Sequence, residues 1–159
     1  MPDIRIDLSR QWLTLRDRGR VLLEAPVSTA AAGVGEQMDS YKTPRGRHRV
    51  RAKIGADAPV GAVFVGRRWT GEVYNPELAA AHPGRDWILT RILWLCGCEV
   101  GRNRLGAVDT QRRYIYIHGT PDSTELGVPG SKGCVRMRNA DLLRLFDLTP
   151  AGMAVDLTE

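Results

Sequence analysis

Apolar and polar residues alternate with a period of two over much of the chain, and this pattern predicts β-strands. At residues 4–8, three apolar side chains alternate with Arg5 and Asp7. A hairpin is predicted where two similar runs flank Gly19, because glycine suits a tight turn between strands. The segments for which we predict strands are 4–8, 11–17, 20–29, 47–51, 86–96, 112–120 and 153–157.

Helical spacing occurs in only two places. Residues 76–84 predict a short helix that ends at a Pro-Gly pair, since both residues interrupt helices. Residues 140–148 carry leucines and a phenylalanine at helical spacing, and Asn139 before them is a predicted N-cap. Proline and glycine two residues apart predict tight turns within 41–50 and 57–66.

The composition is that of an ordinary globular protein, with 43% hydrophobic and 26% charged residues. A chain of 159 residues has room for one core, so we predict a single domain over residues 1–159. Its predicted fold is mainly β, a compact sandwich or mixed sheet with one or two short helices. No run approaches the ~18 apolar residues that a membrane helix needs, so no membrane partner is expected.

The net charge of +5 favours anionic partners, and arginine, which supplies most of it, suits carboxylates and phosphates. Many of the basic residues form one run: Lys42, Arg45, Arg47, His48, Arg49, Arg51 and Lys53. This run is a possible nucleic-acid stripe. The alternation of its arginines instead favours a solvated strand face or the rim of a groove for an anionic substrate, and no nucleic-acid partner is expected. His48 and His82 are predicted to be exposed.

The N-terminal residues lack the uninterrupted apolar region of a secretory signal, and three cysteines are an odd number for a disulfide framework. We therefore expect a reduced, cytoplasmic protein. Cys96 and Cys98 share a strand face with Trp94, which favours packing in the core. A zinc site of Cys96, Cys98, His118 and Cys134 is the alternative, because these residue types bind zinc. No metal is expected.

One histidine and one cysteine form the strongest candidate site. His118 ends an apolar strand, and Cys134 follows sixteen residues later in a polar loop. An imidazole, a cation or a helix start favours a reactive thiolate. His118, Lys132, Arg136 and the predicted helix are such neighbours. Most cysteines are buried core residues, but the charged loop around Cys134 argues against that interpretation. The amides of Gly133 and Cys134 are candidates for an oxyanion hole.

The stretches "YIYIHGT" and "SKGCVRMRNADL" resemble the catalytic core of the YkuD-type L,D-transpeptidases. That family has a His-Gly, a loop of similar length, and then Ser-His-Gly-Cys with Arg or Asn two positions after the cysteine. Other similar segments are "IRIDLSRQWLTLRDRGRVLLEAPVST", "KTPRG", "TRILWLCG" and "GMAVDL". The resemblance therefore extends over nearly the whole chain and implies a YkuD-like fold.

The resemblance implies a role for each matched residue. Cys134 would be the nucleophile and His118 its general base. The carbonyl of Gly119 would orient the imidazole, as a carboxylate does in other triads. The amides of Gly133 and Cys134 would stabilise the oxyanion.

Three further positions are assigned to substrate binding. Arg136 matches the family position that faces substrate or braces the loop, and Ser131 and Lys132 precede the Gly-Cys pair. Lys132 stands where the family usually has a second histidine. Because the general base is His118, this departure leaves the acyl-enzyme mechanism intact and puts only substrate preference in question.

The implied reaction is attack on the L,D peptide bond after the third residue of a peptidoglycan stem tetrapeptide, with release of D-Ala and formation of a thioester. Hydrolysis of soluble muropeptides, as in cytoplasmic L,D-carboxypeptidases, is the favoured outcome. Transpeptidation is the alternative, and a non-catalytic basic binding module is the alternative of another class. Carbapenem-type inhibitors are expected to acylate Cys134, and no cofactor is expected.

Overall fold

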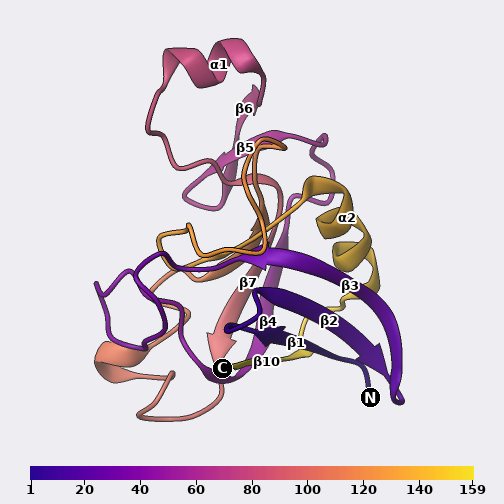
Figure 1. Ribbon diagram of the computed structural model, residues 1–159, viewed down its shortest axis with the longest axis vertical. Coiled ribbons are helices and arrows are strands. Elements are labelled where there is room, and N and C mark those ends of the chain that lie inside the picture. The colour runs from indigo at the N-terminus through magenta and orange to yellow at the C-terminus, as the bar shows by residue number, and fades with distance from the viewer.

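The computed structural model describes residues 1–159 as ten strands and two α-helices (Figure 1). The elements are β1 (Asp3–Asp7), β2 (Trp12–Asp17), β3 (Arg20–Ser28), β4 (Gly46–Ile54), β5 (Ala62–Val65), β6 (Arg68–Val73), α1 (Pro76–Ala81), β7 (Leu89–Gly97), β8 (Tyr116–Gly119), β9 (Val135–Met137), α2 (Asn139–Leu148) and β10 (Ala154–Thr158). Neither helix is long and apolar enough to cross a membrane.

All ten strands belong to one mixed sheet in the order β4-β10-β1-β2-β3-β9-β8-β7-β5-β6. The sheet closes on itself, because β4 also pairs with β7 along most of its length. The pairs β1–β10 and β8–β9 are parallel, and the other pairs are antiparallel. The prediction of a mainly β mixed sheet with short helices is confirmed.

A cluster of 21 buried apolar residues fills the closed sheet. The period-two pattern explains it, since alternate residues of each strand point inward; Leu13 and Leu15 of β2, for example, are fully buried. Helix α2 adds Leu142, Leu145 and Phe146, whose helical spacing places them on one face of the helix. This core holds β8 and β9, which carry the candidate site, on a rigid support.

Strands β5 and β6 form a hairpin that, with α1, projects from the main body of the fold (Figure 1). The short helix predicted within residues 76–84 is present as α1, but only a turn was predicted where the hairpin lies. Strand β6 is exposed along nearly its whole length, so it has no buried alternate positions to reveal it in the sequence. The hairpin matters because its tip, at Arg67, lies over the candidate site.

Two local predictions were wrong. Asn139 is the first residue of α2 and caps nothing. Its amide instead donates to Thr120 O at 3.0 Å and accepts from Thr90 Oγ1 at 2.6 Å, which ties the helix to the end of β8. His48 is 1% exposed and not on the surface. It alternates inward on β4, where its ring nitrogens lie 2.9 Å from Gly46 O and Thr110 Oγ1.

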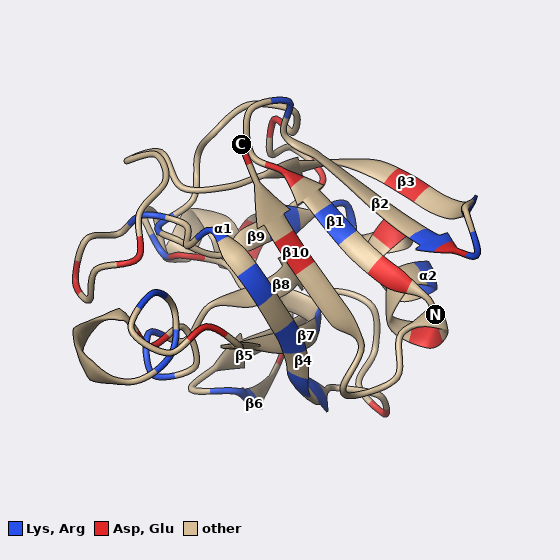
Figure 2. Cartoon of the chain, turned by 90° about the horizontal axis from the view of Figure 1, so that it is seen from below, with Lys and Arg blue, Asp and Glu red and all other residues tan.

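The arginines that alternate with His48 point outward. Arg47, Arg49 and Arg51 are exposed on β4, where Figure 2 shows basic residues in blue along the strand. The solvated strand face predicted from their spacing is therefore present. His82 is exposed at the end of α1, as predicted.

Candidate active site

His118 lies near the end of β8 and is 1% exposed. Its Nδ1 lies 2.6 Å from the carbonyl oxygen of Gly119. A carbonyl oxygen only accepts hydrogen bonds, so Nδ1 carries the proton and donates it. The other nitrogen, Nε2, is left with a free lone pair, which is the form that a general base requires.

Gly119 is needed for this arrangement because of close packing. A Cβ added to it would collide with Asn139 Oδ1 and lie 2.6 Å from Leu89 O. A residue with a side chain would therefore push β8 away from β7 or α2. The His-Gly pair of the sequence thus provides both the imidazole and the backbone space that orients it.

Cys134 lies immediately before β9, and β9 runs parallel to β8 with His118 opposite Arg136. Its thiol is half-buried, accepts from Tyr116 N–H at 3.3 Å and donates to Tyr114 O at 3.4 Å. Cys134 and His118 line the same cavity, which has a volume of about 400 Å³. In this resting arrangement the thiol bonds to backbone groups at the start of β8.

The electrostatics of the site favour the neutral forms of Cys134 and His118. Burial raises the pKa of the Cys134 thiol to about 12, against a smaller lowering by the Tyr116 N–H. Burial also lowers the pKa of His118, while its bond to Gly119 acts in the opposite direction. At neutral pH the site therefore holds a thiol and an imidazole, not a thiolate and an imidazolium.

The charge of Arg136 lowers the pKa of the Cys134 thiol, as predicted for a nearby cation, but burial raises it by more. The Arg136 guanidinium is already bonded to Gly130 O and Asp86, and α2 begins only at Asn139. Lys132 is exposed in solvent. Burial is therefore the largest influence on the pKa of the Cys134 thiol.

The loop before the thiol is held by its own hydrogen bonds. Gly133 has φ +133°, and an added Cβ would lie 3.2 Å from Ile115 Cδ1, so this position requires glycine. Ser131 Oγ accepts from the Gly133 N–H at 3.2 Å and donates to Cys134 O at 2.6 Å. Thr43 Oγ1 donates to Gly133 O at 2.8 Å.

These hydrogen bonds leave one of the two amides predicted to form the oxyanion hole without a free N–H. The Gly133 N–H is engaged by Ser131, whereas the Cys134 N–H makes no hydrogen bond within the chain. Ser131 is 4% exposed, and its hydroxyl is used inside the loop. The catalytic and binding roles of these residues stay predictions; what the structure gives is their placement.

A second, smaller cavity of about 180 Å³ adjoins the first, and Asp86 and Lys132 line both. Arg136 faces this second cavity and forms a salt bridge of 3.1 Å to Asp86. Nothing in the sequence pointed to Asp86, which lies in a loop before β7. Only the fold brings its carboxylate beside the cysteine loop.

Arg67 is a further lining residue that the sequence did not reveal. Its guanidinium lies 4.5 Å above the ring of Tyr114 and 5.0 Å from that of Trp94, and donates to the Tyr116 hydroxyl at 3.0 Å. Arg67, Tyr114 and Tyr116 form one wall of the cavity of Cys134, and Trp94 packs behind them. These residues come from the β5–β6 turn, β7 and the chain entering β8.

Cys96 and Cys98 are half-buried and lie outside both apolar clusters, so the prediction that they pack in the core was wrong. Cys96 lines a different cavity, described below. No group of three or more His, Cys, Asp or Glu side chains is placed to hold a metal ion, so the alternative zinc site is not assembled.

The family model of the YkuD L,D-transpeptidase catalytic domain matches residues 2–157. The chain belongs to the YkuD family. A Bacillus licheniformis protein named as a YkuD L,D-transpeptidase is 38% identical over 47 residues, which are 30% of this chain and 28% of that protein. The ErfK/SrfK L,D-transpeptidase of Escherichia coli is 40% identical over 47 residues, 15% of its length. The matches thus span less than a third of these curated relatives.

Solved structures share the fold of the YkuD domain. An L,D-transpeptidase from Mycobacterium smegmatis superposes with a TM-score of 0.59 at 19% identity, covering 99% of this chain and 58% of that one. LdtMt1 in complex with imipenem gives 0.58 at 17% identity, with coverages of 99% and 58%. The Xylanimonas cellulosilytica L,D-transpeptidase gives 0.54 at 22% identity, with coverages of 98% and 59%.

Proposed function

We propose that this YkuD domain is a cysteine acyl-enzyme that cleaves the L,D peptide bond after residue 3 of peptidoglycan stem tetrapeptides and passes the acyl group to water. The observation that carries the proposal is the hydrogen bond from His118 Nδ1 to Gly119 O. It leaves Nε2 unprotonated in the cavity that Cys134 also lines. Family membership supplies the substrate class.

The reaction begins with both partners neutral. Nε2 of His118 takes the thiol proton as Sγ attacks the carbonyl carbon, so charge develops only along the reaction path. The Cys134 N–H is the donor available to the oxyanion. Collapse of the tetrahedral intermediate breaks the C–N bond, and the imidazolium returns its proton to the departing amine of D-Ala. Nε2 then deprotonates a water molecule, which attacks the thioester and regenerates the thiol.

The two adjoining cavities suggest how the substrate lies. The cavity of Cys134 takes the first three stem residues, and the smaller one takes the leaving D-Ala, whose carboxylate meets Lys132. Arg136 braces the loop through Asp86 and Gly130, which fits the loop-bracing alternative predicted for it. A space of about 180 Å³ suits an amino acid and water, and this size supports hydrolysis as the outcome. We propose cytoplasmic, soluble muropeptides as the substrates, because water is the abundant acceptor there.

Transpeptidation is the second candidate, because relatives and structural neighbours carry the name L,D-transpeptidase. An amine acceptor would then enter the smaller cavity after D-Ala leaves. The acyl-enzyme and the roles of Cys134 and His118 would be the same in both cases, so only the fate of the thioester separates them.

Incubation with a tetrapeptide muropeptide, with and without a D-amino acid acceptor, tests this proposal by mass spectrometry of the products. Tripeptide plus D-Ala in both cases supports hydrolysis, whereas exchange that outruns hydrolysis at low acceptor concentration would show a transpeptidase. Cys134→Ala should abolish D-Ala release while the protein stays folded. Retained binding with no release by either protein would identify a non-catalytic module.

Imipenem provides an independent test of the nucleophile, since a structural neighbour is a complex with it. We expect an adduct on the intact protein that maps to Cys134 and is absent from Cys134→Ala. A mass shift located on Cys96 or Cys98 would contradict the assignment of Cys134.

A further inference from the structure

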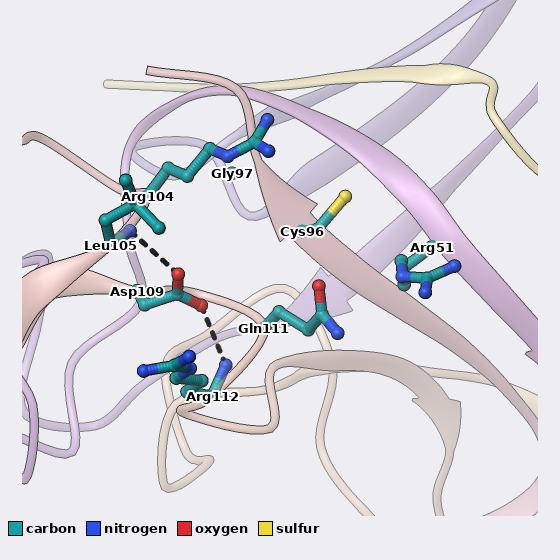
Figure 3. Close-up of a pocket in the computed structure, with 8 residues that line it drawn as sticks. All are labelled: Arg51, Cys96, Gly97, Arg104, Leu105, Asp109, Gln111 and Arg112. Carbon is teal, nitrogen blue, oxygen red and sulfur yellow. Dashed lines mark hydrogen bonds between the residues drawn. The ribbon is translucent and has the colours of Figure 1, made fainter. Parts of the chain in front are cut away.

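A separate cavity of about 290 Å³ lies between β4, the end of β7 and the loop before β8. It shares no residue with the two cavities beside Cys134. In the close-up, Cys96 and Gln111 lie between Arg51 on one side and Arg104 and Arg112 on the other, and the Arg112 guanidinium extends away from Gln111 (Figure 3).

The three arginines are free to bind a ligand. None of their guanidinium groups takes part in a hydrogen bond within the chain or in any of the seven salt bridges. Arg51, Arg104 and Arg112 are exposed and unpaired, and together they give the cavity a positive potential that favours an anionic ligand.

The one carboxylate of the cavity does not fulfil this role. Asp109 is 7% exposed and accepts from the backbone N–H of Leu105 at 2.7 Å and of Arg112 at 3.0 Å. The Asp109 carboxylate therefore holds the loop in place. Burial raises its pKa, but the hydrogen bonds from these amides lower it further, so the net shift is downward. Glu99, two residues after the end of β7, accepts hydrogen bonds from the Arg47 N–H and the Arg102 side chain.

We propose that this cavity, defined by Arg51, Arg104 and Arg112, binds a phosphate-bearing ligand. A phosphoryl group presents three oxygens and carries about two negative charges, so it can pair with more than one of the cationic side chains that line this cavity. The Gln111 amide supplies a further donor. The volume accommodates a phosphate or diphosphate group together with a small organic portion.

The cavity is connected to the catalytic site through one short segment. Gln111 O accepts from Trp94 Nε1 at 3.1 Å, and Tyr114, three residues later, accepts from the Cys134 thiol. The rings of Trp94 and Tyr114 also contact each other, with their centroids 6.2 Å apart. A ligand that orders Gln111 and Arg112 therefore acts on the backbone that positions the thiol.

Cys96 provides a reporter for the test, because its thiol lines the cavity. The full chain is titrated with inorganic pyrophosphate at constant ionic strength, and iodoacetamide modification of each cysteine is followed by peptide mass spectrometry. Saturable slowing of Cys96 modification by about tenfold, with Cys98 little changed, is the expected result for a bound anion that covers the thiol.

Variants show whether the arginines make the site. Arg104→Gln and Arg112→Gln should each weaken pyrophosphate binding about tenfold, the loss of one charge-assisted hydrogen bond. Arg20→Gln, on the exposed start of β3, is the matched control and should bind as the parent does. Equal losses in all three variants, or no saturable binding, would overturn the site.

Competition with other anions identifies which class of anion the cavity binds. Citrate that binds as well as pyrophosphate would overturn the assignment to phosphate. Glycerol 3-phosphate and uridine diphosphate separate a free phosphate ligand from an organic one. Equal affinity of all phosphate compounds supports a site for the phosphoryl group alone, and tighter binding of an organic phosphate supports a site that also contacts the attached portion.

Discussion

Thr43 Oγ1 donates a hydrogen bond of 2.8 Å to the carbonyl oxygen of Gly133 and accepts one of 2.9 Å from the Ala30 N–H. The side chain is fully buried. It therefore joins three distant segments of the chain at the residue before the proposed nucleophile. The Thr-Pro turn of the sequence is a support for the cysteine loop.

Thr43→Val removes this support while keeping the volume of the side chain. We expect kcat to fall about tenfold with little change in KM, because the loop that carries Cys134 loses its fixed position. Thr43→Ser retains the hydroxyl and should restore kcat. A valine variant that is less stable but has the parent kcat would show that Thr43 has only a structural role.

Gly133→Ala should lower the free energy of unfolding by about 1–3 kcal/mol and slow acylation by imipenem, since alanine is strained at φ +133° and its Cβ approaches Ile115. Gly127 also has a positive φ, of +86°, but an added Cβ meets nothing within 4 Å. Gly127→Ala is thus a control for backbone strain alone. The contact with Ile115 would be irrelevant if both variants behaved alike in unfolding and acylation.

The raised pKa of Cys134, about 12, predicts an unusual pH dependence of its alkylation. Without substrate, the rate of iodoacetamide modification should keep rising about tenfold per pH unit from pH 7 to 10, because the thiolate fraction grows over that whole range. Glutathione, measured in parallel, should level off near its own pKa. A plateau of the Cys134 rate below pH 8 would reveal a preformed thiolate and contradict the neutral pair.

Two buried histidines predict acid sensitivity. Burial lowers the pKa of both His48 and His118, so they stay neutral in the fold at a pH where the unfolded chain is protonated. Their contribution to stability is complete above the unfolded pKa of ~6.5 and is lost as pH falls through the folded values. Each adds a slope of up to ~1.4 kcal/mol per pH unit.

Chemical denaturation at pH 7.5, 6.5 and 5.5 measures this slope. His48→Gln should reduce it, since glutamine retains a donor for Gly46 O but does not titrate. His82→Gln is the control, because His82 is exposed. If the slope were the same in all three proteins, protonation of His48 would not drive the acid unfolding.

Lys132 marks the departure of this chain from the usual family motif and lines both cavities of the candidate site. Lys132→Gln should raise KM for the tetrapeptide about fivefold with kcat little changed, since it removes the charge proposed to bind the terminal carboxylate. A tetrapeptide that ends in D-alanine amide should be cleaved equally by both proteins. An equal rise in KM for the amide substrate would place the contact elsewhere.

The sequence revealed the parts of the site whose signals are local. His118-Gly119 and Gly133-Cys134 are adjacent pairs on either side of one loop, and glycine at both positions is required by close packing or by a positive φ. The strands were predictable where one face is buried, since burial produces the period of two.

The features of the site that the sequence did not predict depend on tertiary contacts. Asp86 and Arg67 come from segments far from the motif, one at the start of a predicted strand and the other just after a predicted turn, and no local pattern marks either as part of the site. The protonation state of Cys134 could not be predicted from its neighbours in sequence, because burial raises the pKa of the thiol by more than the charge of Arg136 lowers it. Asparagine is a preferred N-cap residue, but the side-chain amide of Asn139 forms hydrogen bonds with Thr90 and Thr120 and not with the helix backbone.

The neutral resting state of the Cys134 thiol affects how fast peroxide oxidises it. Peroxide attacks cysteine as the thiolate, and the first product, sulfenic acid, leads on to irreversible forms. A nucleophile that keeps its proton until a carbonyl carbon is in place is a poor target for peroxide between turnovers. The burial that raises the pKa of Cys134 thus also protects this thiol, the proposed nucleophile, from oxidation.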